Sequence, residues 1–255
     1  MLLHTPDLLL LALAALGAGF IDAVAGGGGL IQIPALLLAL PDQAPAPLLG
    51  TNKGASVFGT TNAAWRYGRR IALPWRGFLL PGSVAAFASA FAGAAVATSL
   101  RKDTLRPLVL LLLIAVWLHT MLRPDFGKAR GVALANPLLP AIGVCALIGF
   151  YDGFFGPGTG SFLIFAFVRI FGFDFLDASA CAKVVNAVTN FAALAWFIPH
   201  GQIIWPLVGI MAVCNVAGAW LGSGLALKHG SAFVRGAFLL VVGALIVRIG
   251  LDTFA

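Results

Sequence analysis

A carboxylate followed by a cluster of glycines interrupts a long apolar segment, and this interruption occurs twice in the chain. The first copy is GFIDAVAGGGG at residues 19–29, and the second is GFYDGFFGPG at residues 149–158. Each glycine in a helix interior costs about 1 kcal/mol relative to alanine. Each copy therefore predicts two helices separated by a break, with Asp22 or Asp152 in the last turn before the break.

The two copies are separated by a constant number of residues, which is the distance from Gly19 to Gly149. Identical residues at this separation also occur outside the two copies. Apolar matches arise easily by chance in an apolar chain, whereas matched charged residues do not. The matched pairs are Gly19/Gly149, Phe20/Phe150, Asp22/Asp152, Gly26/Gly156, Gly28/Gly158 and Lys53/Lys183. We interpret the chain as one integral membrane domain made of two pseudo-symmetric repeats, 1–125 and 130–255.

The composition places the chain in the membrane. Hydrophobic residues make up 60% of it and charged residues 10%, with a mean hydropathy of +1.00. Soluble domains carry about 25% charged residues. The formal net charge of +7 comes mostly from basic residues in loops between apolar segments, which is typical of membrane orientation and does not indicate a nucleic-acid partner.

The apolar segments predict an all-α polytopic bundle. In the first half they cover 8–25, 30–40, 73–99 and 104–122, with a more polar helix from Gly50 to about Trp65, after a break at Pro41–Pro47. In the second half they cover 134–155, 160–171, 178–198, 203–227 and 232–251. Small residues four apart, Ala86/Ala90 and Gly218/Gly222, predict close helix packing in lipid.

Two topologies fit these segments. Either every long segment crosses the bilayer, or each glycine-broken pair enters the membrane and returns as a re-entrant unit. Lys and Arg of membrane proteins collect on the cytoplasmic side, and the re-entrant topology separates the basic loop residues more strongly. It also makes the halves inverted repeats, which accounts for a basic loop at 66–76 and a counterpart at 199–202 without Lys or Arg. We therefore expect inverted repeats with glycine-broken re-entrant helices.

The glycine clusters are candidate binding elements. Non-helical backbone at membrane depth survives only where protein or a watery cavity satisfies its amides. The short helix after each break would direct its free N–H groups toward that cavity, and helix N-termini bind anions. The amides concerned are those of Gly27 to Leu30 and of Gly158 to Ser161. The alternative is that the glycines serve close helix packing.

Lys53 and Lys183 each lie within an apolar region, where a lysine costs about 2.5–3.5 kcal/mol at the bilayer centre. They are candidate counter-charges for an anion, unless each extends to the headgroups. Asn52, Asn186 and Asn190 would select the substrate, unless they only join helices by hydrogen bonds. The complete set of candidate substrate-binding residues is Gly26, Gly27, Gly28, Gly29, Thr51, Asn52, Lys53, Gly156, Gly158, Thr159, Gly160, Lys183, Asn186 and Asn190.

Three roles are open for Asp22 and Asp152: pairing with the lysines, accepting protons during transport, or capping the next short helix. Enzyme signatures are missing from the sequence. The Gly26–Gly29 run leads into Leu-Ile-Gln-Ile and not into Gly-Lys-Ser/Thr, and no His-Glu-x-x-His zinc motif is possible without glutamate. We expect no enzyme activity, no cofactor and no metal site.

The run at 19–29 with Pro34, the Gly50-Thr51-Asn52 triplet and the cluster at 67–70 closely resemble the sulfite exporter TauE/SafE family, also called toluene sulfonate uptake permeases. The resemblance covers nearly the whole chain. It implies a multi-pass transporter of the bacterial inner membrane with about seven to nine hydrophobic segments. The second half departs from the pattern, because Pro157 and Thr159 interrupt its glycines and Ala180-Cys181-Ala182 replaces Gly-Thr-Asn.

The resemblance implies transport of sulfur-containing anions such as sulfite, sulfoacetate or organosulfonates. The residues alone favour a small oxyanion in a cationic, amide-rich cavity. We therefore expect a secondary transporter that works by rocking of two repeats around a site at the membrane midplane. The alternatives are a passive anion channel and a membrane-embedded enzyme or partner subunit. The expected partners are the anion and the lipid bilayer, with a homo-oligomer possible.

Overall fold

The structure is a computed structural model that describes residues 5–101 and 136–229, together with isolated positions between 107 and 118 and between 243 and 251. The expected spans at 104–122 and 232–251 therefore lie largely outside the described residues. All regular structure in the described residues is helical. The prediction of an all-helical membrane bundle is confirmed.

The described elements are α1 (Thr5–Ala25), α2 (Gly29–Ala39), α3 (Pro45–Gly68), η1 (Trp75–Leu79), α4 (Leu80–Ala97), α6 (Leu138–Phe154), α7 (Thr159–Phe171), α8 (Phe175–Phe197) and α9 (Trp205–His229). The starts of α7, α8 and α9 match those of α2, α3 and η1 at the same offset that relates Gly19 to Gly149. The separation between matched residues in the sequence is therefore also the separation between the starts of these helices.

Both glycine clusters break the helix as predicted. Gly26, after α1, has a φ of 79°, and its match Gly156, after α6, has a φ of 96°. Left-handed backbone of this kind strains any residue with a Cβ atom. The copies differ two residues later, where Gly28 has a φ of −55° and Gly158 a φ of 83°. The two breaks are related in sequence but not identical in backbone.

Two predicted helix starts are corrected by the structure. Helix α3 begins at Pro45 and not at Gly50, because proline is well suited to the first turn, where its missing N–H group is not needed. Helix α8 begins at Phe175 and not at 178. The side chain of Asp174 caps it by accepting a hydrogen bond from the Asp177 amide at 2.8 Å.

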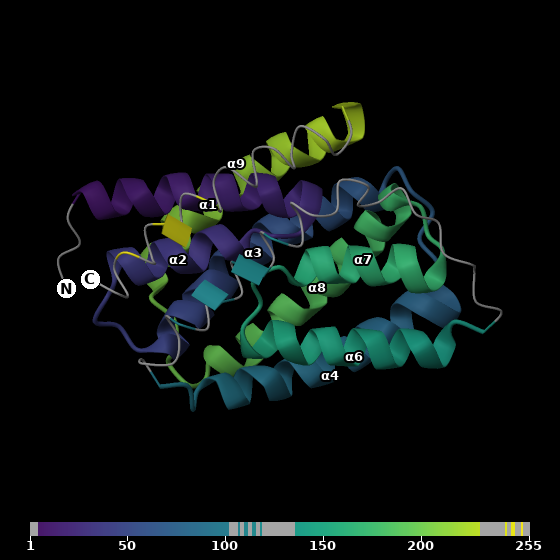
Figure 1. The fold of residues 1–255 in the computed structure, drawn as a ribbon, viewed down its shortest axis with the longest axis horizontal. Helices are drawn as coiled ribbons and strands as arrows, with labels where there is room; N and C mark the ends of the chain where they lie inside the picture. Colours follow the sequence, from purple (N-terminus) through teal and green to yellow (C-terminus); the bar gives the residue numbers. More distant parts are fainter. Residues whose placement is uncertain are drawn as a thin grey trace.

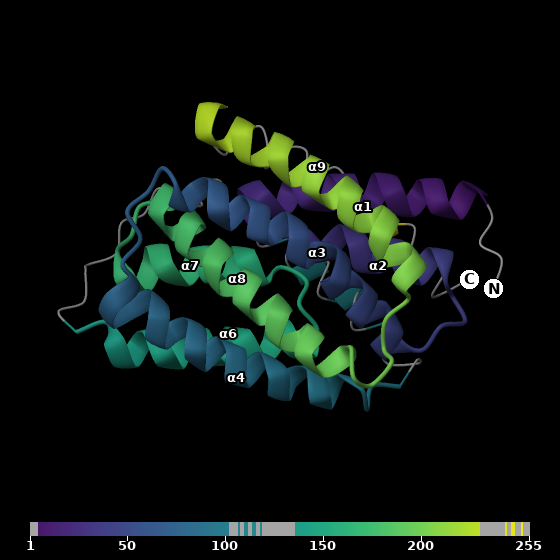
Figure 2. The same ribbon diagram turned by 180° about the vertical axis from the view of Figure 1, so that it is seen from behind.

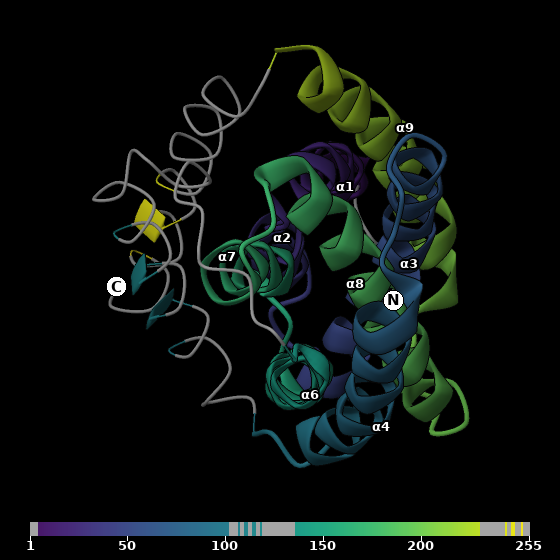
Figure 3. The ribbon, with the colours of Figure 1, turned by 90° about the vertical axis from the view of Figure 1, so that its right-hand side faces the viewer.

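The helices form two layers. Figure 1 shows α1, α2, α7 and α6 on the near side, and Figure 2, seen from behind, shows α9, α3, α8 and α4. In the end-on view, α2 and α7 lie between α1 and α6 (Figure 3). Helices of the first half of the chain pack against helices of the second half, since α1 packs on α9 and α4 packs on α6.

The two breaks meet inside this assembly. The Ser161 amide, at the start of α7, donates a hydrogen bond to the Gly26 carbonyl at 3.0 Å. A Cβ atom on either Gly26 or Gly160 would overlap the backbone of the other. From this meeting point α2 and α7 extend in opposite directions (Figure 1). The starts of the two short helices are therefore placed next to each other.

Small residues allow the interlocked helices to approach closely. Gly218 and Gly222 of α9 lie against the carbonyls of Leu16 and Phe20 in α1, with no room for a Cβ atom. On the opposite side of the bundle, Gly149 and Gly153 of α6 lie against α4 at Ala86 and Ala90. The sequence prediction that Ala86/Ala90 and Gly218/Gly222 mark close packing is confirmed.

The outer surface is apolar and the interior holds the polar groups. Leu139, Leu147 and Val213 are more than 70% exposed, whereas Lys183, Thr51 and Gln32 are fully buried. Four helices among the described residues are long and apolar enough to cross a membrane, at Thr5–Val24, Trp75–Ala97, Phe175–Phe197 and Trp205–Leu225. This distribution is the one expected of a multi-pass membrane protein.

Candidate functional site

A buried ion pair joins the two halves of the chain at the second glycine break. The ammonium of Lys53, in α3, lies 2.7 Å from Oδ2 of Asp152, in the last turn of α6. The side chains are 3% and 2% exposed. Gly156 keeps the space beside the pair open, since a Cβ atom there would stand 2.9 Å from Lys53 Nζ. The break thus leaves room for the ammonium.

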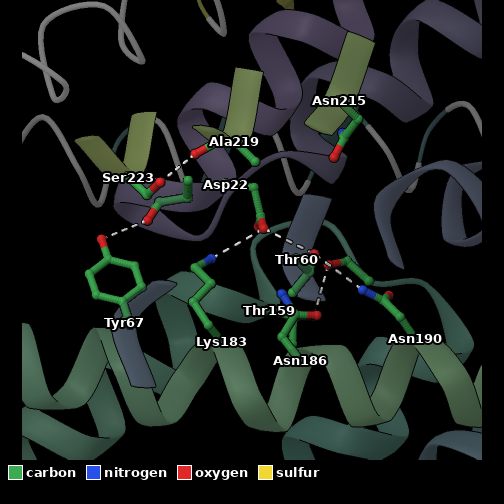
Figure 4. Close-up of polar contacts among 12 residues, drawn as sticks. Asp22, Thr60, Tyr67, Thr159, Lys183, Asn186, Asn190, Asn215, Ala219 and Ser223 are labelled. Carbon is green, nitrogen blue, oxygen red and sulfur yellow. Dashed lines mark hydrogen bonds and ion pairs between the residues drawn. The ribbon is translucent and has the colours of Figure 1, made fainter. Parts of the chain in front are cut away.

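A second ion pair joins the halves at the first break. Lys183 of α8 extends toward α1, and its Nζ lies 3.2 Å from Oδ2 of Asp22 (Figure 4). The Lys183 side chain is 0% exposed and that of Asp22 is 15% exposed. Thr60 of α3 donates a hydrogen bond to the same carboxylate oxygen at 3.2 Å, and Asn190 of α8 donates to Thr60 Oγ1 at 3.5 Å.

These contacts narrow the roles left open by the sequence. Both lysines are buried in ion pairs, so the alternative that they extend to the headgroups is wrong. Both aspartates pair with a lysine of the opposite half. The N-cap positions of α2 and α7 are instead occupied by Gly28 and Gly158, which have no side chain to cap them.

The two breaks and the first ion pair surround a small polar cavity of about 20 Å³, enough for roughly one water molecule. Its lining comes from α1, α3, α6, α8 and α9 as well as from both glycine clusters. The lining residues are Asp22, Gly26, Gly29, Asn52, Lys53, Ser56, Thr60, Asp152, Gly156, Gly158, Gly160, Asn186, Asn190 and Asn215. Amides, hydroxyls and charges dominate this surface.

The structure brings most of the predicted site residues together at this cavity. The residues named from the sequence that do not line it are Gly27, Gly28, Leu30, Thr51, Thr159, Ser161 and Lys183. Thr51 instead accepts a hydrogen bond from the Ile204 amide at 2.9 Å, at the start of α9. Thr159 donates to the Gly156 carbonyl at 2.8 Å and so stabilises the second break.

Some of the backbone amides that the sequence offered to an anion already have partners. Leu30 donates to the Gly27 carbonyl at 3.0 Å and Thr159 to the Gly156 carbonyl at 3.2 Å. Ser161 donates across the halves to Gly26. These three amides hold the two breaks in shape and are not free to bind an anion.

The sequence analysis missed three lining residues. Ser56 and Thr60 follow Asn52 by one and two helical turns, which places all three on one face of α3. They also match Asn186 and Asn190 at the offset that relates Lys53 to Lys183. Both signals were present in the sequence and could have identified them.

The third missed residue, Asn215, gave no such signal. Its amide donates to the side-chain oxygen of Gln32, in α2, at 3.1 Å and to the Ala15 carbonyl at 3.3 Å. Gln32 in turn donates to the Asn52 carbonyl at 3.3 Å. A buried amide network therefore fixes α2 to α1, α3 and α9 beside the cavity. Only the packing of α9 against α1 brings Asn215 there.

The fold and this site define a multi-pass membrane protein with a charged, polar cavity in its interior, and its relatives are named as membrane transporters. The sulfite exporter TauE/SafE family model matches residues 11–249. The chain belongs to the sulfite exporter TauE/SafE family and is a membrane transporter.

Three relatives cover most of the chain. A probable membrane transporter protein, ORF9, of Sinorhizobium sp. is 38% identical over 95% of this chain and 92% of its own length. The probable membrane transporter protein YfcA of Escherichia coli K12 is 35% identical over 92% of this chain and 87% of its own. One of Haemophilus influenzae is 36% identical over 86% and 84%. No solved structure matches the chain significantly.

Proposed function

We propose that this transporter carries a small sulfur oxyanion, such as sulfite or a sulfonate, across the bacterial inner membrane. The family description names sulfite export. The observation that carries the proposal is the position of Lys53, whose buried ammonium faces a cavity lined by amides and hydroxyls. A cation with several neutral hydrogen-bond donors around it suits an oxyanion, which accepts hydrogen bonds at every oxygen.

The binding residues in this proposal are Lys53, Asn52, Asn186 and Asn190, with Ser56 and Thr60 beside them. The cavity holds about one water, and an oxyanion of four or more heavy atoms needs several times that space. Binding therefore requires the site to widen. The Asp152 carboxylate already occupies the position at Lys53 that an anion would take. An incoming oxyanion replaces this carboxylate on the ammonium.

We also propose that 1–125 and 130–255 are inverted repeats whose broken helices re-enter the membrane. Helices α2 and α7 have 11 and 13 residues, short of the roughly 20 that cross a bilayer. Each turns back from the helix before it (Figure 1). The exchange of ion pairs between Lys53 and Asp152 and between Lys183 and Asp22 supports a two-fold relation. Rocking of the halves about these pairs would then expose the cavity alternately.

Conduction through a permanently open channel needs a continuous watery path. Around this cavity the described residues leave space for about one water, which favours a transporter that changes conformation. Within the described residues no group of three or more His, Cys or Asp side chains could hold a metal ion. An anion transporter is the interpretation that these observations favour.

A binding titration tests the proposal. Purified protein is titrated with sulfite, sulfate, thiosulfate, taurine, sulfoacetate and chloride, and binding is followed by calorimetry and thermal shift. Selective binding of one sulfur oxyanion is the expected result. The control is Arg76→Gln, which removes an exposed cation of the η1 segment away from the cavity and leaves the affinity unchanged. Equal, weak responses to all six anions would contradict the proposal.

A further inference from the structure

The two ion pairs differ in how they meet the cavity. Lys53 and Asp152 both line it, so an anion that enters can reach the ammonium and displace the carboxylate. In the second pair only Asp22 lines the cavity, and Lys183 lies behind it with its side chain 0% exposed. An anion in the cavity meets the negative member of this pair first. The Lys53–Asp152 pair is therefore the one that can open toward a ligand.

Charge balance limits what can enter. The two lysines and two aspartates of the site sum to zero charge. A monoanion that bound alone would leave one uncompensated negative charge in a buried site, and uncompensated buried charge is strongly unfavourable. A carboxylate that loses its counter-charge in such surroundings is favoured in its neutral form. The displaced carboxylate is that of Asp152.

We propose that Asp152 takes up one proton when the anion binds, so that one monoanion and one proton are carried together. This inference rests on the proposed function. In the step, the contact between Lys53 Nζ and Asp152 Oδ2 breaks and Nζ contacts the anion. A proton from water on the open side of the membrane bonds to the freed carboxylate. One negative and one positive charge enter together, so the site stays neutral and transport is electroneutral.

Among the described residues, the groups near Asp152 include one other carboxylate that could take up this proton. Lys53 reaches it from α3, and Tyr151 precedes it on α6, with its hydroxyl donating to the Pro157 carbonyl at 2.6 Å. Helix α4, packed along α6, contains no ionisable residue, and the cavity-facing end of α7 contains none. The other carboxylate is that of Asp22, across the cavity, which keeps Lys183 and the Thr60 hydroxyl as partners throughout.

The test uses the full-length protein in liposomes and methanesulfonate, which stays a monoanion at all working pH values. A methanesulfonate gradient is imposed with the membrane potential clamped at zero. A pH-sensitive dye inside the liposomes reports proton movement, and radiolabelled methanesulfonate reports the anion. We expect one proton to enter with each anion, at a rate that an imposed membrane potential does not change.

Asp152→Asn separates coupling from binding. The neutral amide leaves Lys53 free for the anion but cannot take up a proton. We therefore expect exchange of labelled for unlabelled methanesulfonate to continue, while proton entry falls at least tenfold and anion binding loses its pH dependence. Asp177→Asn is the control, because it removes a carboxylate of α8 that does not line the cavity, and it keeps proton entry.

Each other outcome overturns a defined claim. Anion entry without proton entry in the unmodified protein, driven by the membrane potential, overturns the coupling and leaves the anion transporter in place. Continued proton entry in Asp152→Asn overturns the assignment to this residue. Absence of both methanesulfonate binding and flux contradicts transport of sulfonates, and the coupling inference then falls with the proposed function for this substrate.

Discussion

Both buried ion pairs join a lysine to an aspartate, but they differ in how they contact the cavity. Lys53 and Asp152 both face the cavity, next to the left-handed turn at Gly156. Lys183 does not line it, and its partner Asp22 also accepts a hydrogen bond from Thr60. We therefore propose that a ligand can open the Lys53–Asp152 pair, while the Lys183–Asp22 pair holds helices together. The repeated sequence pattern marks the charged residues, but it does not predict which of them line the cavity.

Buried ion pairs are poor evidence of stability in themselves, because desolvation of the charges opposes their attraction. Removal of one partner is strongly destabilising, since it leaves the other charge buried and unpaired. The comparison between the pairs can therefore be tested by single substitutions, which measure the unpaired charge. Paired neutral substitutions then measure what the ion pair does for function.

The largest effect is expected from Asp22→Asn, which leaves the fully buried Lys183 without its counter-charge. We expect a loss of about 3–5 kcal/mol in the free energy of unfolding, measured by denaturant titration in detergent. Lys183→Met should cost less, because Asp22 is 15% exposed and keeps the Thr60 hydrogen bond. The reverse order would show that Asp22, and not Lys183, is the group that depends on the pair.

The double substitution Lys183→Met with Asp22→Asn should return the free energy of unfolding to within about 1 kcal/mol of the unmodified value, since no charge stays unpaired. The same holds for Lys53→Met with Asp152→Asn. Denaturant titrations of the four single and two double variants form two double-mutant cycles. Additive losses in either cycle would mean that its two residues do not form the ion pair.

Gly156→Ala tests the left-handed backbone turn beside the Lys53–Asp152 pair. A φ of 96° strains an alanine by about 1–2 kcal/mol, and the new Cβ atom would stand 2.9 Å from Lys53 Nζ. We expect lower thermal stability and weaker anion binding. The control is Gly143→Ala, in the helix α6 with nothing within 4 Å of the new Cβ atom, which should gain up to about 1 kcal/mol. Equal effects of the two changes would contradict this account of the break.

The smallest effect is expected from Thr60→Val, which keeps the side-chain shape and removes the hydroxyl between Asp22 and Asn190. We expect a loss of about 1 kcal/mol in the free energy of unfolding. Thr98→Val is a matched control, because the Thr98 hydroxyl bonds only within its own turn, to the Ala95 carbonyl at 2.6 Å. A loss no larger than that of the control would remove Thr60 from the Asp22 network.

Much of this arrangement could be predicted from the sequence because the signals were local. The glycine clusters specified the two breaks, and the constant offset between the halves related Asp22 to Asp152 and Lys53 to Lys183. What could not be predicted depends on how the helices pack. Each lysine pairs with the aspartate of the opposite half, which requires the relative positions of α3, α6, α8 and α1.

The start of α3 is a second feature that the sequence analysis did not predict correctly. The prolines from Pro41 to Pro47 resemble a continuous break, yet Pro45 opens the helix, because a proline in the first turn lacks only an N–H group that the helix does not use. Asn215 had no local signal, and it reaches the cavity only because the small residues of α9 allow close contact with α1.

The most direct measurement is anion binding to the two neutral double variants, compared by calorimetry at one pH with the anion that the unmodified protein binds. We expect both variants to fold, because neither contains a buried unpaired charge at these positions. The account predicts that Lys53→Met with Asp152→Asn loses binding at least a hundredfold, while Lys183→Met with Asp22→Asn keeps binding within about tenfold. Full binding by the Lys53 variant, or loss in the Lys183 variant alone, would contradict the assignment of the anion site to Lys53.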